Sequence, residues 1–269
     1  MTDDSAGGAA SVVRRRDGCD GDAESAASPR YVIRKLQSAA EVTDRVGEII
    51  EQTAPDVYHF IYGDVPAAKL TALARADGNC FSWHNLWAAY ETDARTGALG
   101  DVVGIVVAYE PSRVEMNGYF GTLVAHFGVL RAVQYALRYN LLYALPSGGA
   151  RLACEDAAER TFLVQEVAVA ARVRGRRIAT RLLNAVEQHA RRCCRATAPA
   201  PRYCLTLEVA EENRTARRLY EHLGFRCADP APRYHTPFPC LPGAVRWSRM
   251  VKDCTEPPFA DPDCLDPAE

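Results

Sequence analysis

Two strand-and-helix units follow one another between residues 162 and 225, and this order constrains the fold of the 269-residue chain more than any other feature. Residues 162–169 are apolar except for Gln165 and Glu166. Such a run is typical of a central strand that is covered on both faces. The helix that follows it has apolar residues at helical spacing along one stripe, namely Ile178, Leu182, Val186 and Ala190. The first unit therefore predicts a buried strand with a helix packed against it.

The connection between this strand and its helix has the features of an anion site. The first N–H groups of a helix have no intrahelical partner, and the helix dipole favours negative charge there. Gly175 lets the backbone approach a phosphate closely, and arginines surround it at positions 172, 174, 176 and 177. The segment therefore predicts a phosphate-binding loop. A solvated basic helix start is one alternative, and a nucleic-acid surface along residues 172–195 is a weaker one, because aromatic residues are not interleaved with the arginines.

The second unit has the same order of strand and helix. Residues 203–209 predict a strand, and residues 213–223 predict a helix with one apolar face. Gly224 is expected to end that helix, since glycine is the usual residue just beyond a helix C-terminus. Together the two units predict an α/β fold whose central strands are parallel.

The preceding residues predict a mixture of short elements. Residues 31–36 predict a first strand, and residues 39–52 and 66–76 predict helices. Residues 86–90 and 102–109 predict a hairpin, with Gly104 at a bulge or bend. Residues 119–145 are apolar and aromatic and predict a helical insertion before the central strand. Arg131 and Arg138 interrupt this run, which argues against a membrane helix.

Composition sets the expected domain boundaries. Residues 1–29 are rich in Ala, Gly, Ser and Asp without apolar periodicity, and residues 253–269 combine prolines with acidic residues. Both segments are expected to be disordered. The folded domain is therefore expected to span residues 30–252, with the helical insertion at about residues 111–160.

Two motifs in this order resemble the GNAT superfamily of N-acetyltransferases. Val167-Ala168-Val169 followed by Arg174-x-x-Arg177-x-Ala179 looks like the acetyl-CoA signature Arg/Gln-x-x-Gly-x-Gly/Ala. Asn213-x-x-Ala216-x-x-Leu219-Tyr220-x-x-Leu223-Gly224-Phe225 looks like the last helix of the family. The chain departs from the first pattern where Arg177 replaces a glycine. A helical, outward-facing Arg177 would there pair with a coenzyme phosphate.

The resemblance implies the acyl-CoA N-acyltransferase fold, an α/β fold in which a mixed, mostly antiparallel sheet is flanked by helices. It implies an enzyme that uses acetyl-CoA as co-substrate, needs no metal, and transfers the acetyl group directly to a primary amine of a small molecule or protein through a ternary complex. The backbone of the central strand is expected to pair with the pantetheine arm as an extra strand would. The coenzyme-binding residues that it implies are Val167, Ala168, Val169, Arg174, Gly175, Arg176, Arg177, Ile178, Ala179, Thr180, Asn213 and Tyr220.

Acetyl transfer to an amine requires a base, because the ammonium form must lose a proton before it can attack. Glu208 precedes Tyr220 by twelve positions, which looks like the base–acid spacing of ribosomal-protein alanine N-acetyltransferases, and Glu208 is ranked first. Glu166 is the second candidate, and for either carboxylate an ion pair with an arginine is the alternative role. Tyr220 is expected to protonate the leaving thiolate. Tyr234 and His235 are lower-ranked candidates near the acceptor site.

Other features narrow the class of protein. The ten cysteines are scattered without a CxxC pair or a zinc-binding spacing, and the N-terminus lacks an apolar signal segment. Reduced thiols and a cytoplasmic location are therefore expected. The net charge of -2 gives no reason to expect a nucleic-acid partner. A non-catalytic acyl-CoA-binding regulatory module stays open as an alternative, and a nucleic-acid-binding protein is less favoured. These motifs do not set the oligomeric state, and a homodimer is one option.

Overall fold

The computed structural model describes residues 30–111, 116–144, 159–195, 202–228, 234–235 and 246–254. The expected disordered segment at residues 1–29 lies outside these ranges. So do residues 255–269 of the expected tail and residues 112–115 and 145–158 of the insertion.

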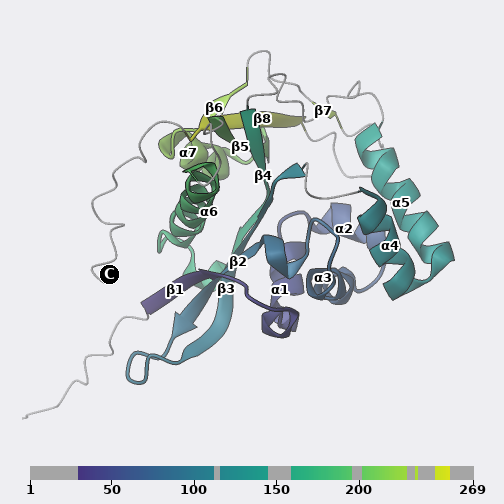
Figure 1. Ribbon diagram of the computed structural model, residues 1–269, viewed down its shortest axis with the longest axis horizontal. Coiled ribbons are helices and arrows are strands. Elements are labelled where there is room, and N and C mark those ends of the chain that lie inside the picture. Colours follow the sequence, from purple (N-terminus) through teal and green to yellow (C-terminus); the bar gives the residue numbers. More distant parts are fainter. Residues whose placement is uncertain are drawn as a thin grey trace, which may run out of the picture.

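An eight-stranded sheet runs through the molecule in the order β1-β2-β3-β4-β5-β8-β6, and β7 also pairs with β8 (Figure 1). Its strands are β1 (Arg30–Lys35), β2 (Leu86–Thr92), β3 (Leu99–Tyr109), β4 (Glu159–Val169), β5 (Arg202–Ala210), β6 (Arg226–Cys227), β7 (Tyr234–His235) and β8 (Arg246–Asp253). Only β4 and β5 pair in parallel among the described strands, and the other neighbours are antiparallel. The predicted α/β fold with a mixed, mostly antiparallel sheet and a parallel central pair is confirmed.

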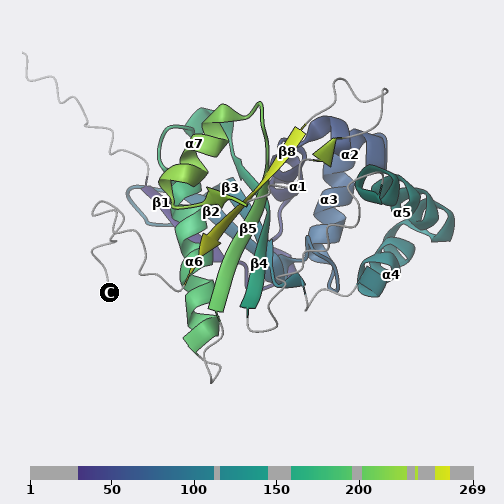
Figure 2. The ribbon, with the colours of Figure 1, turned by 90° about the horizontal axis from the view of Figure 1, so that it is seen from above.

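Helices cover both faces of this sheet (Figure 2). One face carries α6 (Ile178–Arg195) and α7 (Arg214–His222). The other carries α1 (Asp44–Glu51), α2 (Pro55–Tyr62) and α3 (Pro66–Arg75). The insertion forms α4 (Met116–Phe127) and α5 (Val129–Ala144), which lie outside α2 and α3 and away from the sheet.

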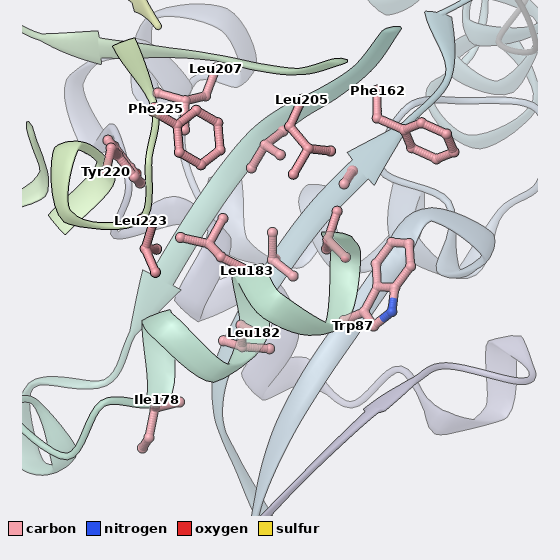
Figure 3. Close-up of a cluster of buried hydrophobic side chains, with 14 of the residues drawn as sticks. Trp87, Phe162, Ile178, Leu182, Leu183, Leu205, Leu207, Tyr220, Leu223 and Phe225 are labelled. Carbon is pink, nitrogen blue, oxygen red and sulfur yellow. The ribbon is translucent and has the colours of Figure 1, made fainter. Parts of the chain in front are cut away.

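The apolar stripe of α6 fixes this helix against the sheet (Figure 3). Ile178 and Leu182 belong to the buried cluster that also contains Trp87 of β2 and Leu205 of β5. All four residues of the predicted stripe are buried. Each large apolar side chain removed from water in this way contributes about 1.5–3 kcal/mol. The phosphate-loop end of α6 is therefore anchored by the core, as the sequence periodicity predicts.

Gly104 allows α6 to lie close to β3. A Cβ at this position would lie 3.2 Å from Ile178 Cγ2, 3.3 Å from Leu182 Cδ1 and 3.2 Å from the Ala168 carbonyl oxygen. The β2–β3 register also shifts beside it, between Ala89 and Tyr90, which confirms the predicted irregularity. Gly104 thus lets the start of α6 approach the strand that precedes it in the chain.

The N-terminal half differs from its sequence prediction in two places. The helix expected over residues 39–52 is interrupted, because a short 3-10 turn (Ala39–Glu41) precedes α1. Helix α2 was not predicted at all, although Pro55 lies in its first turn and Gly63 follows its end with φ +69°. Both are ordinary signals for the two ends of a helix.

Two boundaries also need correction. The insertion is helical as predicted, but it is a pair of helices separated at Gly128, which has φ +78°. Asp253, the first residue of the expected disordered tail, is instead the last residue of β8 and pairs with Cys204.

Candidate functional site

The parallel pair at the centre of the sheet separates partway along its length. Pairing between β4 and β5 ends at Val164 and Leu207. Beyond this point β4 continues along β3 to Val169, while β5 continues along β8. Among the strands that the structure describes, none pairs with this edge of β4 over its last five residues. The edge therefore faces a gap.

The ladder between β3 and β4 decides which backbone groups face this gap. Ala170 donates its N–H to the Val103 carbonyl oxygen at 2.8 Å, so Ala170 faces β3. Because alternate residues of an antiparallel strand face the same neighbour, Ala168 also faces β3, whereas Val167 and Val169 face the gap. Their N–H and C=O groups have the orientation that an added strand requires.

The loop between β4 and α6 has alternating backbone handedness. Gly175 has φ +80°, Arg177 has φ +56°, and Arg176 between them does not have a positive φ. Successive residues of opposite handedness turn their N–H groups into one concavity, which binds anions. The sequence interpretation of Arg177 as helical is therefore wrong. Arg177 lies just before α6 in the left-handed conformation that a glycine would adopt, and its carbonyl oxygen accepts the hydrogen bond from Arg181 N.

The arginines around this loop differ in what they contact. Arg174 donates from Nε to the Val169 carbonyl oxygen at 3.1 Å, across the mouth of the gap. Arg172 pairs with Glu91 at 2.6 Å, and the Arg176 guanidinium lies 6.0 Å from the ring centre of Tyr31. Arg174 also lines an open hollow of about 450 Å³ whose other walls come from α1 and the start of α2, namely Glu48, Glu51, Gln52 and Pro55.

The remaining predicted loop residues serve the helix start. Ile178 and Thr180 are buried, and Ala179 is half-buried. Their backbone N–H groups belong to the first turn of α6, which provides the unpaired donors of a helix N-terminus. The loop and the helix start together fit the pyrophosphate of a coenzyme.

Glu166 lies on the opposite side of β4 from the α6 core. The β3–β4 register shifts between Val107 and Ala108, which leaves Gln165 as an extra residue on β4. Because of this bulge, Val164 packs in the α6 core, whereas Glu166 points toward α2. The Tyr58 hydroxyl of α2 donates a short hydrogen bond to Glu166 Oε1. Burial raises the pKa of the Glu166 carboxyl to about 7, against the lowering effect of hydrogen bonds from Thr53 and Tyr58.

Glu208 has a different environment. Arg249 of β8 donates from Nη2 to Glu208 Oε1 at 3.4 Å, and both side chains are partly buried. Burial raises the pKa of Glu208, and the charge and hydrogen bond of Arg249 oppose this rise. An ion pair with an arginine was the alternative to a catalytic role for both carboxylates, and Glu208 forms such a pair.

Tyr220 and Asn213 lie at the two ends of the turn-and-helix segment after β5. Tyr220 is 8% exposed and packs edge-on against Phe225, with ring centres 5.9 Å apart (Figure 3). Burial raises the pKa of Tyr220 to about 12, with a smaller contribution from the charge of Glu166. Asn213 caps α7 by accepting from Ala216 N at 3.1 Å. The predicted acid and the second predicted base therefore interact with each other.

The C-terminus of α7 keeps Tyr220 in place. Phe225 N donates to the Tyr220 carbonyl oxygen at 2.9 Å, and Gly224 N donates to the Glu221 carbonyl oxygen at 3.0 Å. Gly224 has φ +87°, so the helix ends in a Schellman motif as Gly224 predicts.

Several sequence expectations concern parts that the structure describes only in part. Tyr234 and His235 form β7, and their side chains lie outside the described part of the chain. Within the described residues, no group of three or more metal-binding side chains could hold an ion. None of the helices described here has the length and apolarity that crossing a bilayer requires. The cysteines at positions 80, 193, 204, 227 and 254 are thiols rather than disulfides.

Sequence reasoning missed the groups that surround Glu166. Tyr58 is 108 positions from Glu166, and neither Tyr58 nor Thr53 belongs to a motif. Arg249 was also missed as the partner of Glu208. Only the signals for the ends of α2, Pro55 and Gly63, could have indicated that a helix carries Tyr58.

Comparisons with known proteins agree with this geometry. Residues 138–227 match the family model described as the acetyltransferase (GNAT) domain. Among solved structures, the chain is similar to a crystal structure described as that of an acetyltransferase, with a TM-score of 0.51, 19% identity, and coverage of 83% of this chain and 99% of that one. It is also similar to Arabidopsis thaliana NAA60 in complex with acetyl-CoA, with a TM-score of 0.48, 16% identity, and coverage of 84% and 100%. At such identities the likeness concerns the fold.

A further similar structure is the N-acetyltransferase from Staphylococcus aureus Mu50, with a TM-score of 0.47, 15% identity, and coverage of 82% of this chain and 99% of that one. No curated protein sequence matches the chain. The matched domain contains β4, the loop before α6, α6 itself, β5 and α7, which are the elements around the gap. Residues 138–227 therefore match an acetyltransferase (GNAT) domain, and the fold of the chain is similar to that of a solved acetyltransferase.

Proposed function

We propose that the chain transfers an acetyl group from acetyl-CoA directly to a primary amine of a small molecule or a protein. The observation that carries this proposal is the gap between β4 and β5. In this proposal the exposed edge of β4 and the loop before α6 hold the coenzyme, while Glu166 and Tyr220, whose pKa the Glu166 charge raises, transfer the protons. A coenzyme site and two proton-transfer groups around one gap suit a reaction between a thioester and an amine.

In this proposal the backbone holds most of the coenzyme. The pyrophosphate binds the N–H groups of the loop at residues 174–178, where the helix dipole and the nearby arginines favour negative charge. The pantetheine arm pairs with Val167 and Val169 as an added strand. The arm replaces the hydrogen bond from Arg174 Nε to the Val169 carbonyl oxygen, so the Arg174 guanidinium becomes available to a phosphate oxygen.

Glu166 is the base in this proposal. A general base works best with a pKa near the working pH, and burial raises the pKa of Glu166 to about 7. Glu208, which ranked first on spacing, is instead paired with Arg249, and this pairing favours a structural role. The order of the two candidates is therefore reversed.

The reaction then needs no covalent enzyme intermediate. Glu166 accepts a proton from the acceptor ammonium, and the neutral amine attacks the thioester carbonyl carbon. A C–N bond forms, backbone N–H groups at the gap stabilise the oxyanion, and the C–S bond breaks. Tyr220 donates its proton to the departing thiolate, and the Tyr220 phenolate then takes the second amine proton from the nitrogen of the new amide. With its pKa raised to about 12, the Tyr220 hydroxyl is protonated at neutral pH and can serve as this acid.

Acetyl-CoA with pooled amines and N-terminal peptides tests the proposal through release of free thiol. We expect Glu166→Gln to lower kcat by at least about 100-fold, as expected for loss of a general base. Glu208→Gln is the matched control, because it makes the same carboxyl-to-amide change on the neighbouring strand, and it should keep most of the activity. Equal losses in the two variants would contradict the assignment of Glu166 as the base.

A simpler measurement separates the alternatives. Coenzyme A at about 100 times its Kd should raise the free energy of unfolding by about 2.7 kcal/mol. Absence of any stabilisation at saturating coenzyme A would overturn the proposal. Stabilisation without thiol release from any amine would favour a non-catalytic binding module. A nucleic-acid-binding protein would show binding that falls steeply with salt and is indifferent to coenzyme A.

A further inference from the structure

We propose that Tyr58 is a positioning residue for Glu166, and that the α4–α5 insertion holds α2 where Tyr58 can perform this role. The proposal rests on the assignment of Glu166 as the base under the proposed function. It gives a function to α4 and α5, which lie away from the sheet (Figure 2).

The contact between Tyr58 and Glu166 joins two separate layers of the fold. Tyr58 is 4% exposed and lies on α2, while Glu166 lies on β4. The Tyr58 hydroxyl donates to Glu166 Oε1. Thr53, just beyond the end of α1, also lowers the pKa of this carboxyl, while its own hydroxyl donates to the Ile50 carbonyl oxygen at 2.8 Å. A hydrogen bond to the charged form stabilises the carboxylate and restricts its rotamers. The position and the acidity of Glu166 therefore depend on where α2 lies.

Helix α2 has only eight residues, and a helix of this length is marginal without tertiary contacts. Its C-terminal carbonyl oxygens are held by side chains from other helices. Arg138 of α5 donates from Nη1 to the carbonyl oxygens of Phe60 at 3.1 Å and Ile61 at 3.4 Å. Lys69 of α3 donates from Nζ to the carbonyl oxygen of Tyr62 at 2.5 Å. Positive charge is favourable at this end of a helix. The Arg138 guanidinium thus ties the insertion to α2.

The insertion also contacts α2 through aromatic side chains. The Tyr62 and Tyr119 hydroxyls are 2.8 Å apart and hydrogen-bonded. The Tyr135 ring of α5 packs edge-on against Tyr62, with centres 5.3 Å apart. Tyr62 in turn stacks with Tyr58, with ring centres 6.2 Å apart. A continuous set of contacts therefore leads from α4 and α5 through Tyr62 and Tyr58 to Glu166.

Other titratable groups near Glu166 come from different elements. Cys80 and Tyr220 interact electrostatically with this carboxyl, and burial raises the pKa of each. At neutral pH both are therefore uncharged. The hydrogen bonds from Tyr58 and Thr53 are thus the interactions that favour the ionised form of Glu166.

Tyr58→Phe tests the positioning role, with Tyr135→Phe as the matched control in the same aromatic group. Loss of the Tyr58 hydroxyl should raise the pKa of Glu166 by about one unit or more, because this hydrogen bond stabilises the charged form of the carboxyl. This pKa is measured by 13C NMR titration of glutamate-labelled protein, with Glu166→Gln identifying the signal. The acid limb of kcat/KM should shift by the same amount. Activity near pH 6 should fall about tenfold and recover above pH 8.

Arg138→Met tests the role of the insertion. If Arg138 acts through α2 and Tyr58, this variant should also raise the pKa of Glu166, and Tyr58→Phe/Arg138→Met should show no larger shift than Tyr58→Phe alone. Tyr119→Phe is the milder second variant if Arg138→Met does not fold, and it should give a smaller shift in the same direction. An unchanged pKa in Tyr58→Phe overturns the positioning role. An unchanged pKa in a folded Arg138→Met or Tyr119→Phe, or additive shifts, overturns the role of the insertion.

The NMR readout keeps this proposal separate from the proposed function. If no amine is acetylated but the Glu166 pKa rises in Tyr58→Phe, the acetyl-transfer proposal fails and the positioning role stands. If amines are acetylated and the pH profile of Tyr58→Phe matches that of the wild type, the function stands and the positioning role fails.

Discussion

Replacing Gly175 with alanine would test whether the backbone shape of the loop holds the coenzyme. Gly175 has φ +80°, and no described atom outside its chain neighbours lies within 4 Å of the position that an added Cβ would take. The new methyl group therefore meets open space, and steric contact adds nothing to the cost. What remains is the cost of the left-handed backbone for an L-residue, which is about 1–2 kcal/mol.

This cost can appear in either of two measurements. If the loop of Gly175→Ala keeps its conformation without ligand, the free energy of unfolding falls. If the loop instead relaxes in the free protein, coenzyme binding must restore the conformation, and the affinity falls. The two losses should sum to about 1–2 kcal/mol, and a loss entirely in affinity corresponds to about a 5- to 30-fold higher Kd.

Urea unfolding and calorimetric titration with coenzyme A measure the two terms. Arg177→Ala is the control, because Arg177 already has φ +56° and alanine leaves the backbone cost nearly unchanged. That variant removes an exposed charge, so its loss of affinity should shrink as salt is raised. The loss in Gly175→Ala should not depend on salt. A Gly175→Ala protein with wild-type stability and wild-type affinity would refute the anion-loop geometry.

Three further predictions concern the gap between β4 and β5. Glu166→Gln should stabilise the protein at high pH, because the pKa of about 7 in the folded protein lies above the ordinary glutamate value of 4.5. The wild type therefore loses stability relative to the variant as pH rises through this window, by up to about 3 kcal/mol in urea unfolding at pH 8 compared with pH 4.5. A stabilisation by glutamine that is independent of pH would contradict the raised pKa. Tyr220→Phe keeps the packed ring and removes the acid, so kcat should fall about 100-fold or more while the calorimetric Kd for coenzyme A stays unchanged; a parallel loss of affinity would point to a binding role. Gly104→Ala places a Cβ 3.2 Å from both Ile178 and the Ala168 carbonyl oxygen. It should therefore lower the free energy of unfolding by about 1–3 kcal/mol and weaken coenzyme binding. An unchanged thermal unfolding would show that α6 can move without consequence.

The elements built from strong periodicity could be predicted from the sequence. The apolar stripe of α6 and the near-continuous run of β4 each report burial directly, because the same residues that set the pattern form the core. The end of α7 was equally predictable, since Gly224 supplies the positive φ that the Schellman motif needs. These features depend on residues that are neighbours in the chain.

Features that depend on distant contacts could not be predicted in this way. Helix α2 is short, and it is held by Arg138 of α5 and Lys69 of α3, neither of which its own sequence reveals. Arg177 was interpreted as helical and outward-facing, yet here it takes the left-handed conformation of the glycine that it replaces, which arginine rarely adopts. At such positions the surrounding fold decides the conformation, and local propensity does not.

The two candidate bases show the same limit. Glu208 ranked first because of its distance from Tyr220 in the chain, but the spacing carries no information about Arg249, which reaches it from β8. Glu166 lacks an acidic or basic neighbour in the sequence that would mark it, and its raised pKa comes from burial beneath α2. The local pattern therefore found both carboxylates, and their environments distinguish them.

The bulge at Gln165 explains how one strand can serve both sides of the sheet. In a regular strand, residues two positions apart share a face, so Val164 and Glu166 would point into the same apolar core beneath α6. The extra residue reverses the alternation after Val164. Glu166 consequently turns toward Tyr58, while Val167 returns to the α6 side. A carboxylate in the α6 core would lack these hydrogen bonds, so the bulge is what makes an ionisable group tolerable at the centre of this sheet.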